Sequence, residues 1–135
     1  SERERATLAA HIARYKRWRG VLHAGDLTRL EHPDPGVQGL TVMAKGEGLA
    51  LVAQTGFSQD FDAAPVRFPG LDPDTFYRVR LLEPWPTRPS LYLAHPAAAR
   101  KGLTLSGRAL STQGLALPLT RPETAWLISL ETITP

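Results

Sequence analysis

The sequence predicts a mainly β fold: an antiparallel β-sandwich of the Greek-key type, preceded by one N-terminal amphipathic α-helix. Apolar residues near the N-terminus recur at helical spacing, whereas most later segments alternate with a period of two. Turns rich in glycine and proline recur at short intervals, which is typical of a sandwich and not of alternating strands and helices. We therefore expect a lead-in helix over residues 1–25 and a β-sandwich domain over residues 26–135.

The lead-in helix is predicted over residues 3–23. Acidic side chains lie in its first turn and basic ones in its second half, which complements the helix dipole. Gly25 is expected to end the helix in a left-handed conformation. One stripe of the helix is mostly apolar, and its members are Leu8, Ile12, Tyr15, Trp18 and Leu22. Such a stripe must be buried, so we expect it to fold back on the sandwich, pair with a second copy or pack on a further domain.

Strands with a period of two are predicted in both halves of the chain. In the first half they lie at 27–32, 40–44 and 49–55, and a tight hairpin over 45–48 joins the last two. Further strands are expected at 76–82, 103–107 and 124–133, with only short pieces and turns between 108 and 118. The residues expected to share one face of the first and last of these strands are Tyr77, Val79, Leu81, Trp126, Ile128 and Leu130.

The composition excludes several kinds of chemistry. The chain of 135 residues has no cysteine, which excludes disulfides, zinc–thiolate sites and thiol nucleophiles. No apolar run is long enough to span a membrane, and a cytoplasmic location is the default expectation. No glycine-rich loop has the spacing of a phosphate or dinucleotide site, so no cofactor is expected.

The positive charge of the chain is concentrated in the predicted helix. Residues 1–30 contain seven Lys or Arg against three Asp or Glu, whereas the remainder is nearly balanced. The cluster Arg14, Lys16, Arg17 and Arg19, with the aromatic residues beside it, could contact phosphates and stack on bases. We favour a solvated helix face and keep nucleic-acid binding as the less favoured alternative.

Acidic and histidine residues suggest no catalytic or metal site. Asp60 with Asp62, and Asp72 with Asp74, are paired acids, and two facing carboxylates can hydrolyse a glycosidic bond. Both pairs lie in turn-forming segments, so we interpret them as turn residues. The four histidines lack the spacing of metal ligands; they are His11, His23, His32 and His95.

Trp85 lies between two prolines in the segment 83–89, where the prolines disfavour a central strand. An exposed ring on a rigid loop could form a platform for a sugar or contact a partner. A packed loop anchor is the favoured interpretation, and Trp85 remains the candidate for carbohydrate or partner contact.

Three segments in order give the chain a family resemblance. The first follows the end of the helix, the second contains GLDP followed by Y-x-V, and the third has the pattern L-x-G-x-x-L. Their matching residues are Arg19, Leu22, His23, Gly25, Arg29, Leu30, Gly70, Leu71, Asp72, Pro73, Tyr77, Val79, Leu105, Gly107, Leu110, Gly114, Leu117, Pro118, Leu119, Pro122, Glu123 and Ala125. Together they resemble the C-terminal region of bacterial α-galactosidases of glycoside hydrolase family 36.

The resemblance implies a non-catalytic C-terminal accessory domain. Such a domain would brace a TIM-barrel catalytic domain that hydrolyses terminal α-galactosides with two barrel aspartates, and its lead-in helix would be the last barrel helix. No segment here resembles the barrel, so no catalytic, cofactor or metal-binding residue can be carried over. The expected partner is the barrel, with subunit contacts in a homo-oligomer and contact with an α-galactoside sugar as further expectations. The alternatives are a stand-alone carbohydrate-binding module and, less favoured, a nucleic-acid binder.

Overall fold

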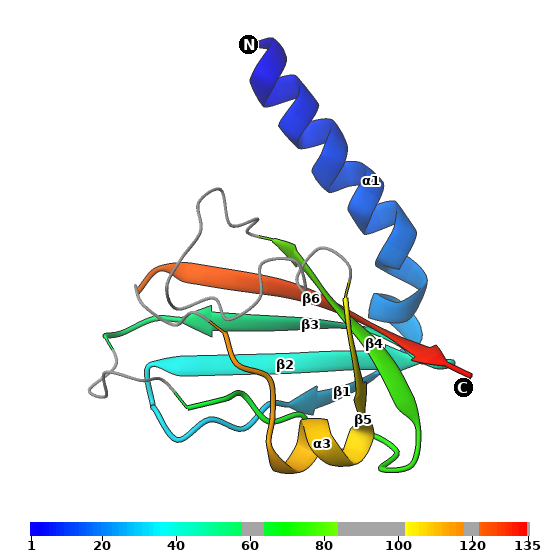
Figure 1. Cartoon of the computed structure of the whole chain (residues 1–135). Coiled ribbons are helices and arrows are strands. Elements are labelled where there is room, and N and C mark those ends of the chain that lie inside the picture. The colour runs from blue at the N-terminus through cyan, green and yellow to red at the C-terminus, as the bar shows by residue number, and fades with distance from the viewer. Residues whose placement is uncertain (58–63, 84–101, 118–121, 135) are drawn as a thin grey trace.

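The computed structural model describes residues 1–57, 64–83, 102–117 and 122–134, and it confirms a mainly antiparallel β fold with one long N-terminal helix (Figure 1). The described strands form one antiparallel sheet in the order β1-β2-β3-β6-β4-β5. The elements are α1 (Glu2–Ala24), β1 (Asp26–Arg29), β2 (Val37–Ala44), β3 (Glu47–Gln54), β4 (Phe76–Glu83), β5 (Leu103–Ser106), α3 (Gly107–Thr112) and β6 (Thr124–Ile133).

Helix α1 begins and ends close to the predicted residues, but its C-terminal cap differs from the prediction. Ser1 caps the helix because its Oγ accepts the Glu4 N–H at 3.2 Å. Gly25 is extended, with φ −80° and ψ 165°, so the predicted left-handed cap is wrong. The chain passes directly into β1, and a Cβ at position 25 would lie 2.6 Å from both Val21 O and Val42 Cγ1. Glycine is needed here for close approach of the helix end to the sheet.

The sheet contains a tight hairpin, and the C-terminal strand lies in its middle. Strands β2 and β3 are joined through Lys45 and Gly46, whose φ angles of 51° and 81° are typical of a type I′ turn. Strand β6 pairs with both β3 and β4, and Thr132 donates from N and Oγ1 to Gly46 O at 2.7 and 2.6 Å. Each predicted strand overlaps a strand of this sheet.

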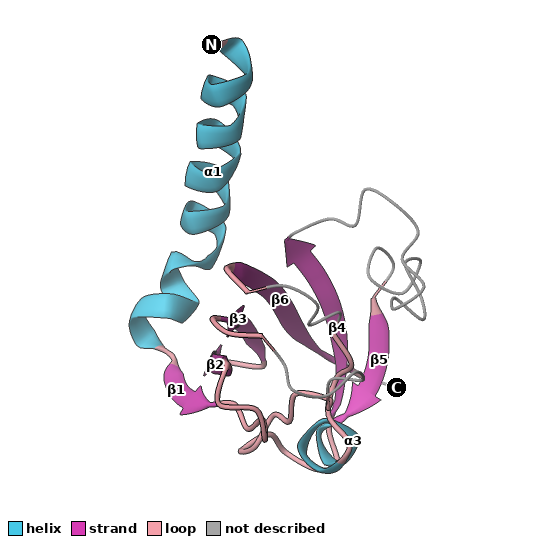
Figure 2. Ribbon diagram, turned by 90° about the vertical axis from the view of Figure 1, so that its left-hand side faces the viewer, coloured by secondary structure: helices cyan, strands magenta, loops and turns pink. Residues whose placement is uncertain are grey.

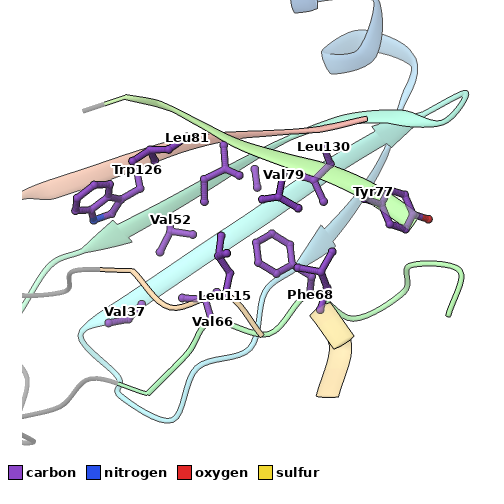
Figure 3. Packing of buried hydrophobic residues seen from close by; sticks show 13 residues of the cluster. Val37, Val52, Val66, Phe68, Tyr77, Val79, Leu81, Leu115, Trp126 and Leu130 are labelled. Carbon is purple, nitrogen blue, oxygen red and sulfur yellow. The ribbon is translucent and has the colours of Figure 1, made fainter. Parts of the chain in front are cut away.

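The main core lies between the inner face of the sheet and a second layer of short segments (Figure 3). The second layer contributes Val66, Phe68, Leu110 and Leu115, and Phe68 and Leu110 have no exposed surface. The sheet contributes all of the residues that sequence periodicity placed inward on its β4 and β6 strands, namely Tyr77, Val79, Leu81, Trp126, Ile128 and Leu130.

The second layer of this core is made of isolated bridges and a short helix instead of long strands. Single antiparallel bridges join Glu31 to Arg67 and Val66 to Leu115. Pro65 and Pro69 flank this segment, and neither has the N–H that a longer strand ladder requires. The layer therefore covers the sheet mainly through its side chains.

Helix α3 was not predicted, because residues 108–118 were expected to form turns. Its start is fixed by Ser106, whose Oγ accepts the Ala109 N–H at 3.1 Å. Leu110 provides its core contact with no exposed surface. Six residues with one fully buried leucine are too short to produce a helical period in the sequence.

Candidate docking surface

Two side chains near the end of α1 anchor the helix on the sheet. Trp18 and Val21 are each 5% exposed, and they cluster with Val42 of β2 and Leu49 of β3. This small second core lies on the outer face of the sheet, opposite the main core, because Val42 and Leu49 alternate with inward residues. Trp18 is therefore the one member of the predicted helix stripe that is buried within the described part of the chain.

An ion pair fixes the same end of the helix to the β2–β3 hairpin. The Arg17 guanidinium donates to both carboxylate oxygens of Glu47, with distances of 2.9 and 3.4 Å. Its central carbon lies 4.4 Å from the centroid of the Trp18 ring. The hydrogen bond to Glu47, together with the charges of Glu47 and Glu131, raises the pKa of Arg17 above its usual value. Arg17 is thus engaged within the chain, which weakens the nucleic-acid alternative.

The remainder of the predicted stripe is exposed. Leu8, Ile12, Tyr15 and Leu22, here called the free stripe, are 61, 46, 49 and 38% exposed. Since successive helical residues are about 100° apart, the free stripe points roughly a quarter turn away from Trp18 and Val21. The N-terminal turns of α1 also project away from the sheet (Figure 2). The expected folding back on the sandwich is met by Trp18 alone, and the free stripe has no cover within the described residues.

A hydrogen bond runs along the free stripe. Tyr15 Oη lies 2.9 Å from His23 Nε2, and the two rings meet edge-on with centroids 5.9 Å apart. His23 lies in the last turn of α1 and is the side-chain partner of Tyr15. This contact holds the Tyr15 ring along the helix surface, so its apolar face remains available to a partner.

The outer face of the sheet is also apolar beyond the area that α1 covers. Its leucines, here called the outer patch, are Leu27, Leu40, Leu51, Leu82 and Leu127. Leu51 is 41% exposed and Leu27 63% exposed. Antiparallel strands with one solvated face normally alternate between apolar and polar residues. The leucines on this second face therefore mark a surface suited to contact with another protein surface.

The acidic and histidine candidates have structural roles where the structure describes them. Asp72 accepts hydrogen bonds from the Asp74 N–H at 3.0 Å and the Thr75 hydroxyl at 2.9 Å, which lower its pKa. His32 Nδ1 accepts the Asp34 N–H at 3.0 Å, so Nε2 carries the proton donated to Ala64 O at 2.7 Å. The two hydrogen bonds to Asp72 confirm the interpretation of its segment as a turn.

The remaining candidates are either outside the described residues or exposed. Asp60, Asp62, Trp85 and His95 fall outside the described residues. His11 is exposed on α1, and within the described ranges no group of three His, Asp or Glu residues could hold a metal. Among the helices the structure describes, none is long and apolar enough to cross a membrane.

Gly107 and Gly114, two residues of the family resemblance, lie where the backbone packs closely, in a region here called the Gly107 corner. A Cβ on Gly107 would lie 2.0 Å from Asp72 O, and Gly107 N donates to Thr75 O at 2.9 Å. A Cβ on Gly114 would lie 2.4 Å from Val66 O, and Gly114 has φ 83°. Glycines of the second and third sequence segments therefore permit close backbone packing between the Asp72 turn, α3 and the second layer.

The sequence of this chain matches known proteins. The profile of the glycosyl hydrolase family 36 C-terminal domain matches residues 40–130. An α-galactosidase from Escherichia coli is 32% identical over 128 residues, which cover 87% of this chain and 18% of that protein.

Solved structures share the fold. The galactosidase domain of the α-galactosidase–sucrose kinase AgaSK has a TM-score of 0.73 and 20% identity, covering 98% of this chain and 16% of that one. The α-galactosidase AgaA from Geobacillus stearothermophilus, solved with raffinose, has a TM-score of 0.72 and 19% identity over the same shares. An α-galactosidase from Lactobacillus brevis has a TM-score of 0.70 and 19% identity, covering 100% of this chain and 17% of that one.

The chain spans between 16 and 18% of the length of these relatives. The matched profile begins within β2 and ends within β6, and it includes the inner core except Val37, the outer patch except Leu27, and the Gly107 corner. Because the profile covers more than half of the sequence, this chain belongs to the glycosyl hydrolase family 36 C-terminal domain family.

Proposed function

We propose that this chain is a non-catalytic accessory domain that packs on the catalytic portion of a family 36 α-galactosidase. The observation that carries the proposal is the free stripe of α1. Its four apolar side chains are between 38 and 61% exposed. The C-terminal end of the same helix, here called its root, is nevertheless fixed to the sheet by Trp18 and by the Arg17–Glu47 ion pair. A helix held rigidly at one end, with an uncovered apolar stripe, is arranged to contact a neighbour.

The partner follows from the relatives. The relatives reported above are α-galactosidases or contain a galactosidase domain, the matched region is less than a fifth of their length, and one was solved with raffinose. We therefore propose that the covering neighbour is the catalytic barrel, that residues 1–25 complete that barrel as its last helix, and that residues 26–135 brace it. The substrate of the assembled enzyme would be a terminal α-galactoside.

The chemistry of the described residues supports a non-catalytic role. Each carboxylate oxygen of Asp72 accepts one local hydrogen bond, from the Asp74 N–H and the Thr75 hydroxyl, and the Asp74 carboxylate lies 3.4 Å from the Arg108 guanidinium. A glycosidase needs one carboxyl as an acid and another as base or nucleophile across an open space. A pair engaged in a turn lacks that arrangement.

The proposal is tested with a chimera of the Escherichia coli relative. The matched 18% of that α-galactosidase is replaced by this chain, and a protease site is placed before Ser1. We expect a soluble chimera that hydrolyses a chromogenic α-galactoside and whose cut halves still elute together. A chimera that folds but separates on cutting would contradict the packing role.

The matched control is the chain by itself. It should hydrolyse no chromogenic α-galactoside, and calorimetric titration with raffinose should give no heat of binding. Turnover by the chain alone would refute the non-catalytic role, and tight raffinose binding would favour the carbohydrate-binding alternative. Sedimentation across a range of concentrations shows whether the free stripe pairs with a second copy.

A further inference from the structure

One row across the outer face of the sheet contains a charged residue, Arg80, beside a buried serine and two buried apolar residues. Across the strands, Arg80 of β4 is opposite Ser129 of β6, Ser129 opposite Leu49 of β3, and Leu49 opposite Val42 of β2. Ser129 is 4% exposed and Leu49 is 8% exposed. Arg80 therefore lies at the β4 end of a row whose β2 and β3 members belong to the small core around Trp18.

The Arg80 side chain is partly buried, and one of its donors is buried without a partner. Its Nε lies out of contact with solvent and has no hydrogen-bond acceptor in the part of the chain that the structure describes. Two neighbouring arginines each have an acidic residue beside them, because Arg17 is paired with Glu47 and Arg78 is opposite Glu131 in the strand register. A donor on a charged group that is withdrawn from water without an acceptor destabilises the fold unless another group supplies one.

We propose that Arg80 is the polar anchor of the docking surface, and that it takes a carboxylate from the protein surface that covers the outer patch. This inference rests on the proposed function and names the chemistry of its partner. The planar guanidinium suits a carboxylate because it can donate two parallel hydrogen bonds. Leu82, which lies on the same strand, and Leu127 place apolar surface beside it.

The covering surface is the catalytic portion of the longer enzyme. The relatives contain more than 80% of their length outside the region matched here. Helix α1 packs on the outer face through Trp18, and the sheet register puts Arg80 on that same face, while the N-terminal turns of α1 project beyond the sheet (Figure 2). An apolar surface with one acidic group would complement both the leucines and the cation.

The first test measures the isolated chain. Arg80→Met keeps the length of the side chain and removes the charge, so the melting temperature should stay unchanged or rise by about 3 °C. Arg78→Met, an exposed position on the same strand and face, is the matched control and should leave the melting temperature unchanged. A fall of more than about 3 °C for Arg80→Met alone would assign Arg80 an internal role and overturn the proposal.

The second test measures docking in the cut chimera. Arg80→Met should weaken the affinity of the released chain for the remaining portion by roughly tenfold or more, and Arg78→Met by less than about threefold. The affinity of the unsubstituted chain should also fall more steeply with salt than that of Arg80→Met. Equal affinities and equal salt dependence for the two variants would overturn the anchor.

Different results would contradict the proposed function and the proposed Arg80 anchor. If the unsubstituted chain does not dock after cutting, the proposed function fails, whatever Arg80 does. If it docks and Arg80→Met docks equally well with the same salt dependence, the accessory role stands and the anchor is wrong.

Discussion

The two faces of the same sheet differ in how they are covered, and strand β3 shows this within three residues. Ala50 and Val52 point inward and have no exposed surface, whereas Leu51 between them points outward and is 41% exposed. The inner face is closed by Phe68 and Leu110 of the chain's own second layer (Figure 3). The outer face is covered by α1 only at its root. The comparison teaches that one face is completed by this chain and the other is suited to completion by a partner.

The largest effect is expected from opening the inner face. Phe68→Ala removes a fully buried ring and leaves a cavity between the second layer and the sheet, so it should lower the free energy of unfolding by about 3–5 kcal/mol. Urea denaturation followed by tryptophan fluorescence measures this change. If the loss stayed below about 1 kcal/mol, the second layer would not be an essential cover of the inner face.

The next largest effect is expected at the helix root. Trp18→Ala removes the main apolar contact between α1 and the outer face, and should cost roughly 2–4 kcal/mol of local stability. Because a helix without tertiary contacts is marginal in water, helical circular dichroism should fall while the β signal is retained. Tyr15→Ala is the control, since Tyr15 is 49% exposed. Equal loss of helicity in both variants would contradict the assignment of the root to Trp18.

A smaller effect on stability, which depends on pH, is expected at the turn that contains Asp72. The Asp74 N–H and the Thr75 hydroxyl lower the pKa of Asp72 in the folded state. The carboxylate thus contributes stability above its ordinary pKa of about 4, and this stability is lost as pH falls through the lower folded-state value. Asp72→Asn should therefore melt at a lower temperature than the unsubstituted chain at pH 7, and the difference should shrink as the pH falls through the lowered pKa of Asp72. A difference that is constant with pH would exclude the charge as its source.

The smallest effect on the isolated chain is expected on the outer patch. Leu51→Gln should change the free energy of unfolding by no more than about 0.5 kcal/mol, because its side chain is already partly solvated. The matched inward variant, Val52→Gln, should unfold the chain at much lower urea concentrations, since Val52 has no exposed surface. Similar losses in the two variants would erase the difference between the faces.

Sequence periodicity was sufficient for most of the fold. The helical spacing of Leu8, Ile12 and Tyr15 and the alternation along β4 and β6 locate elements whose apolar pattern repeats over several helical turns or strand pairs. The same approach missed α3, which is anchored by Leu110 alone, and it gave Gly25 the wrong conformation. In both cases the determining contact comes from a segment distant in sequence, which a local pattern does not contain.

The docking surface was predictable only in part. The apolar stripe of α1 was visible in the sequence, but the division between buried Trp18 and its exposed neighbours depends on the direction in which the helix leaves the sheet. The Arg17–Glu47 pair joins residues 30 positions apart, so the sequence offered no signal for it. Alternation along β4 puts Arg80 on the face opposite Tyr77 and Val79, and only the sheet register pairs it with Ser129, in the same row as Leu49.

Hydrogen exchange of α1 tests the central claim most directly, measured for the isolated chain and for the chimera. In the isolated chain the amides of residues 5–15 should exchange rapidly, since their turns lack contacts with the sheet, whereas those around Trp18 should be slower. In the chimera, residues 5–15 should become strongly protected because the free stripe is then covered. Unchanged exchange over 5–15 in a folded and active chimera would contradict the account.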